Sequence, residues 1–463
     1  MHRHGSPFRA TFAALAALCA VALASAPRAL AQPKPKADAG AARGPSIKTW
    51  KLANGLTVAQ VERRDAPTVT VQVWYRFGSR DEPAGQRGAA RALERLMFEG
   101  SDKMRPDQHR KAIEKIGGDS TSLTTEDVTA FHNAVPRQYL DFALELEAER
   151  MRSLVIRPEA VAKLTAMLGE EARRQESSPL YRAYLQITAS AFSGQPYAWS
   201  PAGVRGEIEA LTAEKLKALY DAYYRPSNAL VIVVGGASAD EVEKAVERRF
   251  GRMPKSDPPA RDPIDPSSSA DGPHRTEMPG SPVGLAFTGF RLPPGKSAEM
   301  PAIQVIGALL TGGPSSRLHR RLVGGKLADE IGGQVLVREG PGLMVAYARV
   351  APQAEAGAVE KALLAEIDKL ALQGPTAAEL RRAKGQVLSA AWFGMESTTG
   401  VANQMGVSWT LTGMPDAFVA DLGRVEKVTA QTVKKAAAGY LGTKRAHVVV
   451  APASAGRPAG GGR

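Results

Sequence analysis

The sequence predicts an α+β chain of two similar halves, each a mainly antiparallel sheet backed by helices. Three observations lead to this fold class. Short stretches that alternate apolar and polar residues, as strands do, are interspersed with longer stretches whose apolar residues recur at helical spacing. The same order of strands and helices occurs twice along the chain. A segment rich in Pro, Ser and Asp at 255–283 separates the two occurrences, which indicates a duplication joined by a linker.

The first half, residues 46–254, opens with two alternating stretches, LTVAQVE and TVTVQVWYRFG, that predict strands. Further along, DSTSLTTEDVTAFHNAV is typical of a hairpin, and two long amphipathic stretches after it predict helices. In order, we expect strands at 56–62 and 68–78, a helix at 86–98, the hairpin at 119–135, helices at 137–154, 158–176 and 212–224, a strand at 228–236 and a helix at 238–251.

The second half, residues 284–452, repeats this order. Its strands alternate in the same way, and its long helices carry apolar residues at helical spacing. We expect a strand at 283–292, helices at 298–311 and 315–324, strands at 330–337 and 342–350, helices at 354–373 and 376–396, a helical region over 400–440 and a last strand from 447. The Gly-rich tail, 453–463, is expected to be disordered.

Residues 1–31 are typical of a secretory signal peptide: a cationic start, an apolar run at 10–26, and an A-x-A cleavage pattern at 29–31 or 24–26. A transmembrane anchor fits less well because the run is short and ends in small residues. A lipoprotein site at Cys19 fits less well because Leu18 is bulky. A Pro/Ala linker at 32–45 follows. We therefore expect a periplasmic or secreted protein without stable membrane insertion.

Cysteine and charge exclude several classes of site. Cys19 is the only cysteine, so the mature chain has no disulfide, thiol nucleophile or thiolate metal site. The formal net charge is +13, and Arg3, Arg9 and Arg28 of the leader supply part of it. The remaining Lys and Arg residues are spread over helices that also carry Glu and Asp, so nucleic-acid binding is not indicated.

One segment of the first half carries a specific likeness. The stretch VWYRFGSRDEPAGQRGAARALERLMFEGS resembles the zinc-site segment of the pitrilysin/insulinase family of metallopeptidases, in its mitochondrial-processing-peptidase-like branch. That family has an H-x-x-E-H motif. Further blocks keep the family's order and spacing over most of the mature chain: IGGDSTSLTTEDVTAFHNAVP, LELEAERM, YYRPSNALVIVVGG and LLTGGPSSRLHRRLVGGKLA.

The resemblance implies a zinc site, but this chain departs from it. The two zinc-ligand histidines fall on Arg91 and Arg95, the general-base glutamate on Glu94, and the distal glutamate ligand on Glu171. A catalytic zinc needs three protein ligands, and a guanidinium stays protonated with no lone pair to give. We expect the metal positions to be vestigial and the chain to hold no cofactor.

Histidines elsewhere offer no local replacement, because no two of the mature chain lie within 20 residues of each other: His109, His132, His274, His319 and His447. Three readings of the two arginines stay open. They neutralise Glu94 and Glu171 in place of zinc, they bind an anionic ligand or a substrate C-terminus, or they are simply solvated.

The resemblance also implies substrate contacts. An Asn-Ala pair on an edge strand, which holds the substrate backbone in active members, falls on Thr121 and Ser122, so this contact is altered here. The family's Arg-Tyr pair falls on Arg317 and Asp329, so half of it persists. Arg317 either grips an extended peptide or is a helix-surface arginine.

We therefore expect two homologous halves of a clam-shell metallopeptidase fold. The expected function is that of an exported, non-catalytic pseudoenzyme subunit that binds extended peptides and pairs with an active zinc peptidase of the same fold, which would carry the zinc. An alternative is a stand-alone peptide-binding or scaffold protein. A third reading, an active metalloendopeptidase with displaced ligands, has the least support from the residues.

Overall fold

The computed structural model describes residues 44–264, 273–442 and 445–451. The predicted signal peptide, most of the 32–45 linker and the predicted disordered tail at 453–463 lie outside these residues. Within the described ranges, no helix combines the length and the apolar character needed to cross a membrane.

The first half contains a six-stranded sheet in the order β1-β2-β6-β3-β5-β4. Every neighbouring pair is antiparallel except β2 and β6, which are parallel. The hairpin predicted at 119–135 is present as β4 and β5, and β4 forms one edge of the sheet. The strands are β1 (Lys48–Lys51), β2 (Thr57–Glu62), β3 (Thr68–Tyr75), β4 (Asp119–Thr124), β5 (Thr129–Pro136) and β6 (Ala229–Gly235).

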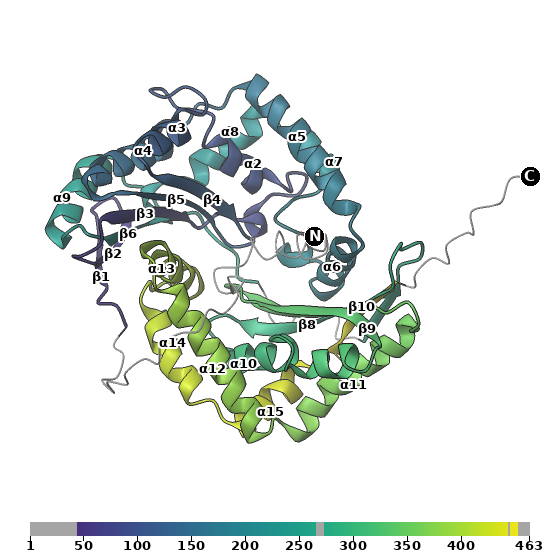
Figure 1. The fold of residues 1–463 in the computed structure, drawn as a ribbon. Coiled ribbons are helices and arrows are strands. Elements are labelled where there is room, and N and C mark those ends of the chain that lie inside the picture. The colour runs from purple at the N-terminus through teal and green to yellow at the C-terminus, as the bar shows by residue number, and fades with distance from the viewer. Residues whose placement is uncertain (1–43, 265–272, 443–444, 452–463) are drawn as a thin grey trace, which may run out of the picture.

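Apart from α6, the helices of the first half cover this sheet on the side away from the second half (Figure 1). Their buried residues form one apolar core with the sheet, which includes Leu93, Leu144 and Val231. The helices are α2 (Ala89–Leu96), α3 (Gln108–Lys115), α4 (Leu140–Ser153), α5 (Pro158–Glu176), α6 (Pro179–Ala191), α7 (Arg205–Glu209), α8 (Ala213–Tyr223) and α9 (Ala239–Phe250).

The second half repeats the arrangement with a five-stranded sheet in the order β7-β11-β8-β10-β9. Only β7 and β11 run parallel. Two sheets backed by helices confirm the predicted fold class. The elements are β7 (His274–Glu277), β8 (Leu285–Pro294), α10 (Met300–Thr311), a π-helical turn at His319–Val323, β9 (Ala328–Leu336), β10 (Pro341–Val350), α11 (Ala356–Gln373), α12 (Ala377–Gly394), α13 (Thr398–Thr412), α14 (Ala417–Glu426), α15 (Ala430–Tyr440) and β11 (His447–Ala451).

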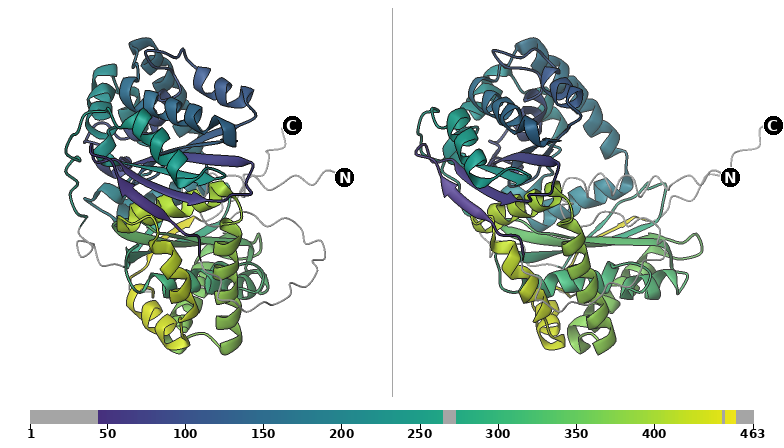
Figure 2. Two further views of the ribbon diagram at one scale, coloured as in Figure 1. Left: turned by 90° about the vertical axis from the view of Figure 1, so that its left-hand side faces the viewer. Right: turned by 60° about the vertical axis from the view of Figure 1, so that its left-hand side comes forward.

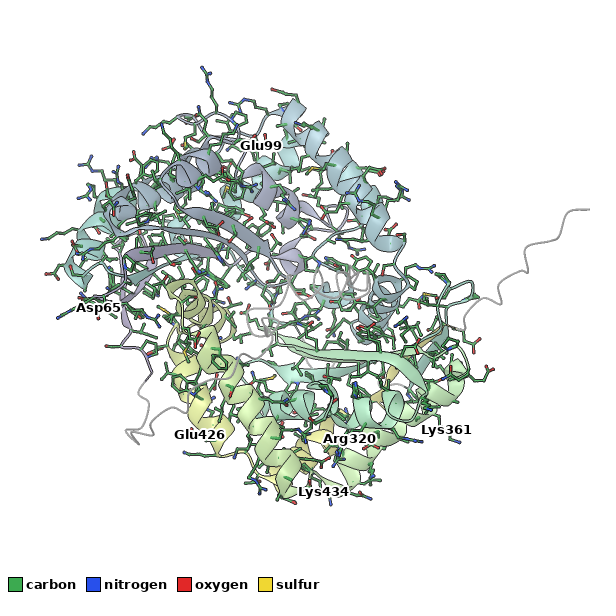
Figure 3. The ribbon with its side chains drawn as sticks, in the orientation of Figure 1. Asp65, Glu99, Arg320, Lys361, Glu426 and Lys434 are labelled. Atoms are coloured by element: carbon green, nitrogen blue, oxygen red, sulfur yellow. The ribbon has the colours of Figure 1, made fainter. Side chains whose placement is uncertain are left out.

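Two helices are exchanged between the halves. Helix α6 of the first half lies on β8 and β11, and helix α13 of the second half lies on β3 and β6 (Figures 1 and 2). Each exchange builds an apolar core from both halves: Tyr184 packs in one cluster with Phe287, and Met405 packs in another with Trp74. Charged side chains such as Lys361 of α11 and Lys434 of α15 project outward at the periphery (Figure 3).

Both exchanged helices approach the opposite sheet through a glycine. A Cβ added to Gly406 of α13 would lie 2.0 Å from Cε2 of Trp74, and one added to Gly289 of β8 would lie 2.3 Å from Cγ2 of Ile187 in α6. Trp74 is held in place because its Nε1–H donates to Oε1 of Gln72 at 2.8 Å.

We expect Gly406→Ala to destabilise the protein by about 1–3 kcal/mol, since a new methyl group in a close-packed core forces side chains or backbone to shift. The measurement is the midpoint of urea unfolding. Gly439→Ala is the matched control, because a Cβ there meets no atom within 4 Å and alanine favours the exposed α15 helix. Equal stability of Gly406→Ala and wild type would contradict the close approach of α13 to β3.

An ionic cluster joins the halves through the segment predicted as a flexible linker. Arg261 donates from Nε and Nη2 to the two carboxylate oxygens of Asp81, at 2.8 and 2.7 Å, and from Nη1 to Oε2 of Glu339. Arg80 lies 3.5 Å from Asp127 and 3.4 Å from Glu339. We call Arg80, Asp81, Asp127, Arg261 and Glu339 the inter-half ionic cluster. The segment 255–283 supplies Arg261 to this cluster and strand β7 to the second sheet.

Candidate functional site

Helix α2 presents two arginines on its open face. Six of its eight residues are buried, and the other two, Arg91 and Arg95, are half-buried. The helix begins after Gly88, whose φ is 111°, and a Cβ on Gly88 would lie 2.5 Å from Cγ1 of Ile208. Helix α2 packs between β4 and α5 (Figure 1), and spacing of four residues places both arginines on one face.

Glu94 is buried with both carboxylate oxygens engaged. The Ser122 hydroxyl donates to Oε1 at 2.7 Å, and the Thr124 hydroxyl donates to Oε2 at 2.6 Å. The hypothesis that an arginine neutralises Glu94 therefore needs correction, because hydroxyl donors of β4 make its contacts. The contact of Thr124 with Glu94 was not predicted from the sequence. Strand periodicity could have indicated this residue, since side chains 122 and 124 of one strand face the same side.

Arg91 makes the ion pair that the neutralising hypothesis expects for Glu171. Its Nη2 lies 2.7 Å from Oε1 of Glu171, and the two side chains are 12% and 28% exposed. Arg95 differs, because its side chain has no hydrogen-bond partner among the described residues, and its Nε atom is buried. The site thus contains one paired and one unpaired guanidinium.

The residues at α2 do not fit a zinc ion. Arginine occupies both positions that would need imidazole, and no group of three or more His, Cys, Asp or Glu residues within the described ranges is arranged to hold a metal. The nearby histidines serve packing. His109 contacts Arg150, and His132 stacks on Trp74 with its pKa lowered by burial to about 4.

Glu82 caps helix α2, which bears the two arginines. It was not predicted from the sequence. Its Oε1 accepts from the Ala90 N–H at 2.9 Å. Burial raises the pKa of Glu82 to about 8 although this hydrogen bond lowers it. The cap therefore holds a proton under conditions where an exposed glutamate has lost it.

We expect a pH dependence of stability from Glu82. Its folded-state pKa lies above the unfolded value of 4.5, so the folded state binds the extra proton, and the free energy of unfolding falls as pH rises from about 4.5 to 8. Glu82→Gln should remove a few kcal/mol of this decline, since each pKa unit corresponds to about 1.4 kcal/mol. The test is urea unfolding at several pH values, with Glu247→Gln on exposed α9 as control. If the unfolding free energy of both variants and of wild type changed with pH in the same way, the predicted role of Glu82 would be contradicted.

The predicted substrate residues are not brought together. Thr121 is exposed and Ser122 half-buried on edge strand β4, beside α2. Arg317 is buried, and its guanidinium binds the Glu379 carboxylate at 3.1 and 2.8 Å and the Gly374 carbonyl at 3.0 Å. Asp329, at the position of the family tyrosine, lies 3.9 Å from Arg349. The geometry gives Arg317 a role in holding the start of α12 and does not support its predicted grip on a peptide.

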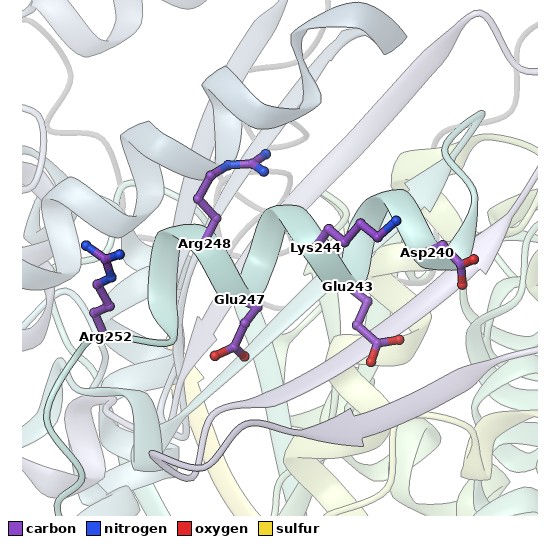
Figure 4. A pocket seen from close by; sticks show the side chains of 6 residues that line it. All are labelled: Asp240, Glu243, Lys244, Glu247, Arg248 and Arg252. Carbon is purple, nitrogen blue, oxygen red and sulfur yellow. The ribbon is translucent and has the colours of Figure 1, made fainter.

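A hollow of about 800 Å³ lies along the outer surface of α9 (Figure 4). Side chains of both charges line it, and they radiate from one helix rather than converge on a point: Asp240, Glu243, Lys244, Glu247, Arg248 and Arg252. Arg248 is paired with Asp141, and Glu243 with Lys48. The hollow has the character of a solvated helix surface.

Two family profiles match the chain. One, described as Insulinase (Peptidase family M16), matches residues 57–203 and so includes α2 and β4. The other, described as Peptidase M16 inactive domain, matches residues 210–387. The zinc protease PqqE of Helicobacter pylori is 29% identical over 364 residues, which are 77% of this chain and 82% of that protein. A probable mitochondrial-processing peptidase subunit beta of Arabidopsis thaliana is 25% identical over 409 residues, 86% of this chain and 76% of that protein.

Solved structures of similar fold support the same assignment. A protease from Helicobacter pylori superposes with a TM-score of 0.81 at 25% identity, covering 88% of this chain and 99% of that one. A peptidase M16 inactive domain from Pseudomonas fluorescens gives 0.80 at 19% identity, covering 88% and 97%. The periplasmic protease PqqL of Escherichia coli gives 0.71 at 16% identity, and the match covers 89% of this chain and 48% of PqqL. The chain belongs to the insulinase (peptidase M16) family.

Proposed function

We propose that this chain is an exported, non-catalytic subunit that binds extended peptides and leaves their hydrolysis to a zinc-bearing partner of the same fold. One observation carries the proposal. Guanidinium groups stand at both positions where the family places zinc-ligand histidines, and one of them is ion-paired with Glu171. A protonated guanidinium cannot donate a lone pair to a metal.

The state of Glu94 supports the same reading. A general base must lie within hydrogen-bond reach of the water whose proton it takes. Both oxygens of Glu94 already accept hydrogen bonds from β4 hydroxyls, and its side chain is buried. The carboxylate therefore serves as a tie between helix α2 and strand β4.

Strand β4 supports the peptide-binding part of the proposal. It is an edge of the first sheet, with no strand on its outer side among the described residues. The backbone N–H and C=O groups of an edge strand are available to an extended peptide that adds as a further strand. Because the backbone makes these bonds, they survive the presence of Thr121 and Ser122 in place of the family's Asn-Ala pair.

The likeness to PqqL supports the partner in this proposal. The match to PqqL covers 48% of PqqL, and a separate structure of the first half of PqqL is 93% covered by this chain at a TM-score of 0.70. The region that matches this chain thus spans about half of PqqL. The proposed partner is a second chain of about the same size with an intact H-x-x-E-H motif.

The test is to purify the mature chain alone and to measure its zinc content by atomic absorption and its cleavage of unstructured peptides. We expect substoichiometric zinc and no chelator-sensitive cleavage. Stoichiometric zinc with cleavage that a chelator abolishes would refute the non-catalytic proposal.

Co-purification from the native source tests the partner. We expect a protein of similar size whose sequence keeps H-x-x-E-H, and cleavage only when both chains are present. Peptide binding by a monomer or homodimer, with no such companion, would instead support the alternative of a stand-alone peptide-binding protein.

A further inference from the structure

The unpaired guanidinium of Arg95 needs an acceptor. Arg95 is half-buried, its Nε atom is buried, and no described residue accepts a hydrogen bond from its side chain. A guanidinium has five N–H donors. The Nε–H of Arg95 is buried without a partner, which is costly, and the two terminal amino groups are not buried, so a ligand can reach them. The open face of α2 therefore carries an unpaired cation that is available to bind an anionic ligand.

The neighbouring carboxylates are already engaged. Glu94 accepts from Ser122 and Thr124 through its two oxygens, and Oε1 of Glu171 is bound to Arg91. Arg91 and Arg95 lie one turn apart, so the Arg91–Glu171 pair occupies one end of the face and leaves Arg95 at the other. An external anion would meet Arg95 without having to break an existing ion pair.

The arginine face lies next to the proposed peptide edge. The Ser122 hydroxyl of β4 donates to Glu94 of α2 at 2.7 Å, so strand and helix are in direct contact. Thr121 beside it is exposed. A peptide strand added to the outer edge of β4 would run past the face that carries Arg95.

We propose that Arg95 forms a carboxylate subsite for the peptide bound at β4, an inference that rests on the proposed peptide-binding function. Planar guanidinium and carboxylate groups match each other in two parallel hydrogen bonds, and such charge-assisted bonds are about twice as strong as neutral ones. The carboxylate comes either from the C-terminus of the peptide or from an Asp or Glu side chain. The chain thereby selects anionic peptides at the position where an active member holds its metal.

The experiment compares three fluorescein-labelled forms of one short Ala/Ser-rich peptide by fluorescence anisotropy with the full mature chain. One has a free C-terminal carboxylate, one a C-terminal amide, and one the amide with a single internal Glu. We expect at least one carboxylate form to bind about tenfold more tightly than the neutral amide, and the tighter form identifies the source. The preference should shrink in high salt.

Arg95→Gln should abolish the preference and leave the affinity for the neutral amide within about twofold, since a tenfold change corresponds to one lost charge-assisted contact. Arg173→Gln removes the same charge from an exposed position on α5, where Arg173 is paired with Glu170, and should keep the preference.

Equal affinity of wild type for all three peptides would overturn the subsite while leaving peptide binding intact. An undiminished preference in Arg95→Gln would overturn it too. Binding of none of the peptides would refute the peptide-binding function, and the subsite with it.

Discussion

Arg91→His combined with Arg95→His is expected to convert a chain that binds no stoichiometric zinc into one that binds about one zinc ion. The two imidazoles would stand four residues apart on one helix face, an arrangement that holds zinc in metallopeptidases. Glu171 already approaches the group at 91, since Oε1 lies 2.7 Å from the Arg91 guanidinium. Loss of that guanidinium frees this carboxylate as the third ligand.

Zinc content and thermal unfolding measure the effect. Free zinc at a hundredfold excess over Kd should stabilise the double variant by about 2.7 kcal/mol, and a chelator should reverse the gain. Adding Glu171→Gln should abolish zinc binding, because a neutral amide replaces the third ligand. Zinc binding by wild type, or none by the double variant, would show that α2 and α5 do not hold the vestigial site assumed here.

The parts of the site that follow local periodicity were predictable from the sequence. Helical spacing puts Arg91 and Arg95 on one face, and strand alternation makes 119–135 a hairpin. The position of its first strand at a sheet edge was implied by the family resemblance. The acceptor of Arg91 was reachable through the family resemblance, which placed Glu171 at the third ligand position. The contacts of Glu94 could not be predicted from the sequence, because they depend on how β4 is positioned against α2.

Contacts between segments far apart in the chain could not be predicted from the sequence. Arg317 was predicted to grip a peptide because its motif matches, but a carboxylate 62 residues later, Glu379, takes up its guanidinium. The exchange of α6 and α13 has no local signal, since an amphipathic helix packs equally well on either sheet. Composition indicated a flexible linker at 255–283, yet it does not reveal that Arg261 inserts among carboxylates of both halves.

Arg261→Ala is expected to cost about 3–5 kcal/mol of unfolding free energy, because removing one partner of a buried ion pair leaves the other charge buried and uncompensated. The side chains of Arg261 and Asp81 are 14% and 4% exposed. Glu339 would keep Arg76 at 3.1 Å and Arg80 at 3.4 Å. Among cations Asp81 would keep Arg80, at 3.9 Å, and its Oδ2 would still accept from the Gly78 N–H at 2.9 Å, so the loss falls mainly on Asp81.

The pH dependence distinguishes a lost ion pair from a lost packing contact. Burial raises the pKa of Asp81, and the hydrogen bonds and charge of Arg261 lower it. Without Arg261 the folded-state pKa of Asp81 rises further above its unfolded value of 3.8. The folded variant then holds a proton at pH values where folded wild type has released it, so its deficit against wild type grows as the pH rises through the folded-state pKa of wild-type Asp81 and shrinks in acid.

Arg173→Ala is the matched control, because its ion pair with Glu170 has a similar length, 2.8 Å, but both side chains are more than half exposed. Such surface pairs contribute about 0–1 kcal/mol. Arg261→Lys should fall between the two, since an ammonium cannot bond Asp81 and Glu339 in the planar fork that the guanidinium provides. A loss in Arg261→Ala that equals the control, or one independent of pH, would mean that the ion pairs of Arg261 contribute little to joining the halves. The predicted loss would instead show that one residue of an apparent linker contributes strongly to joining the two halves.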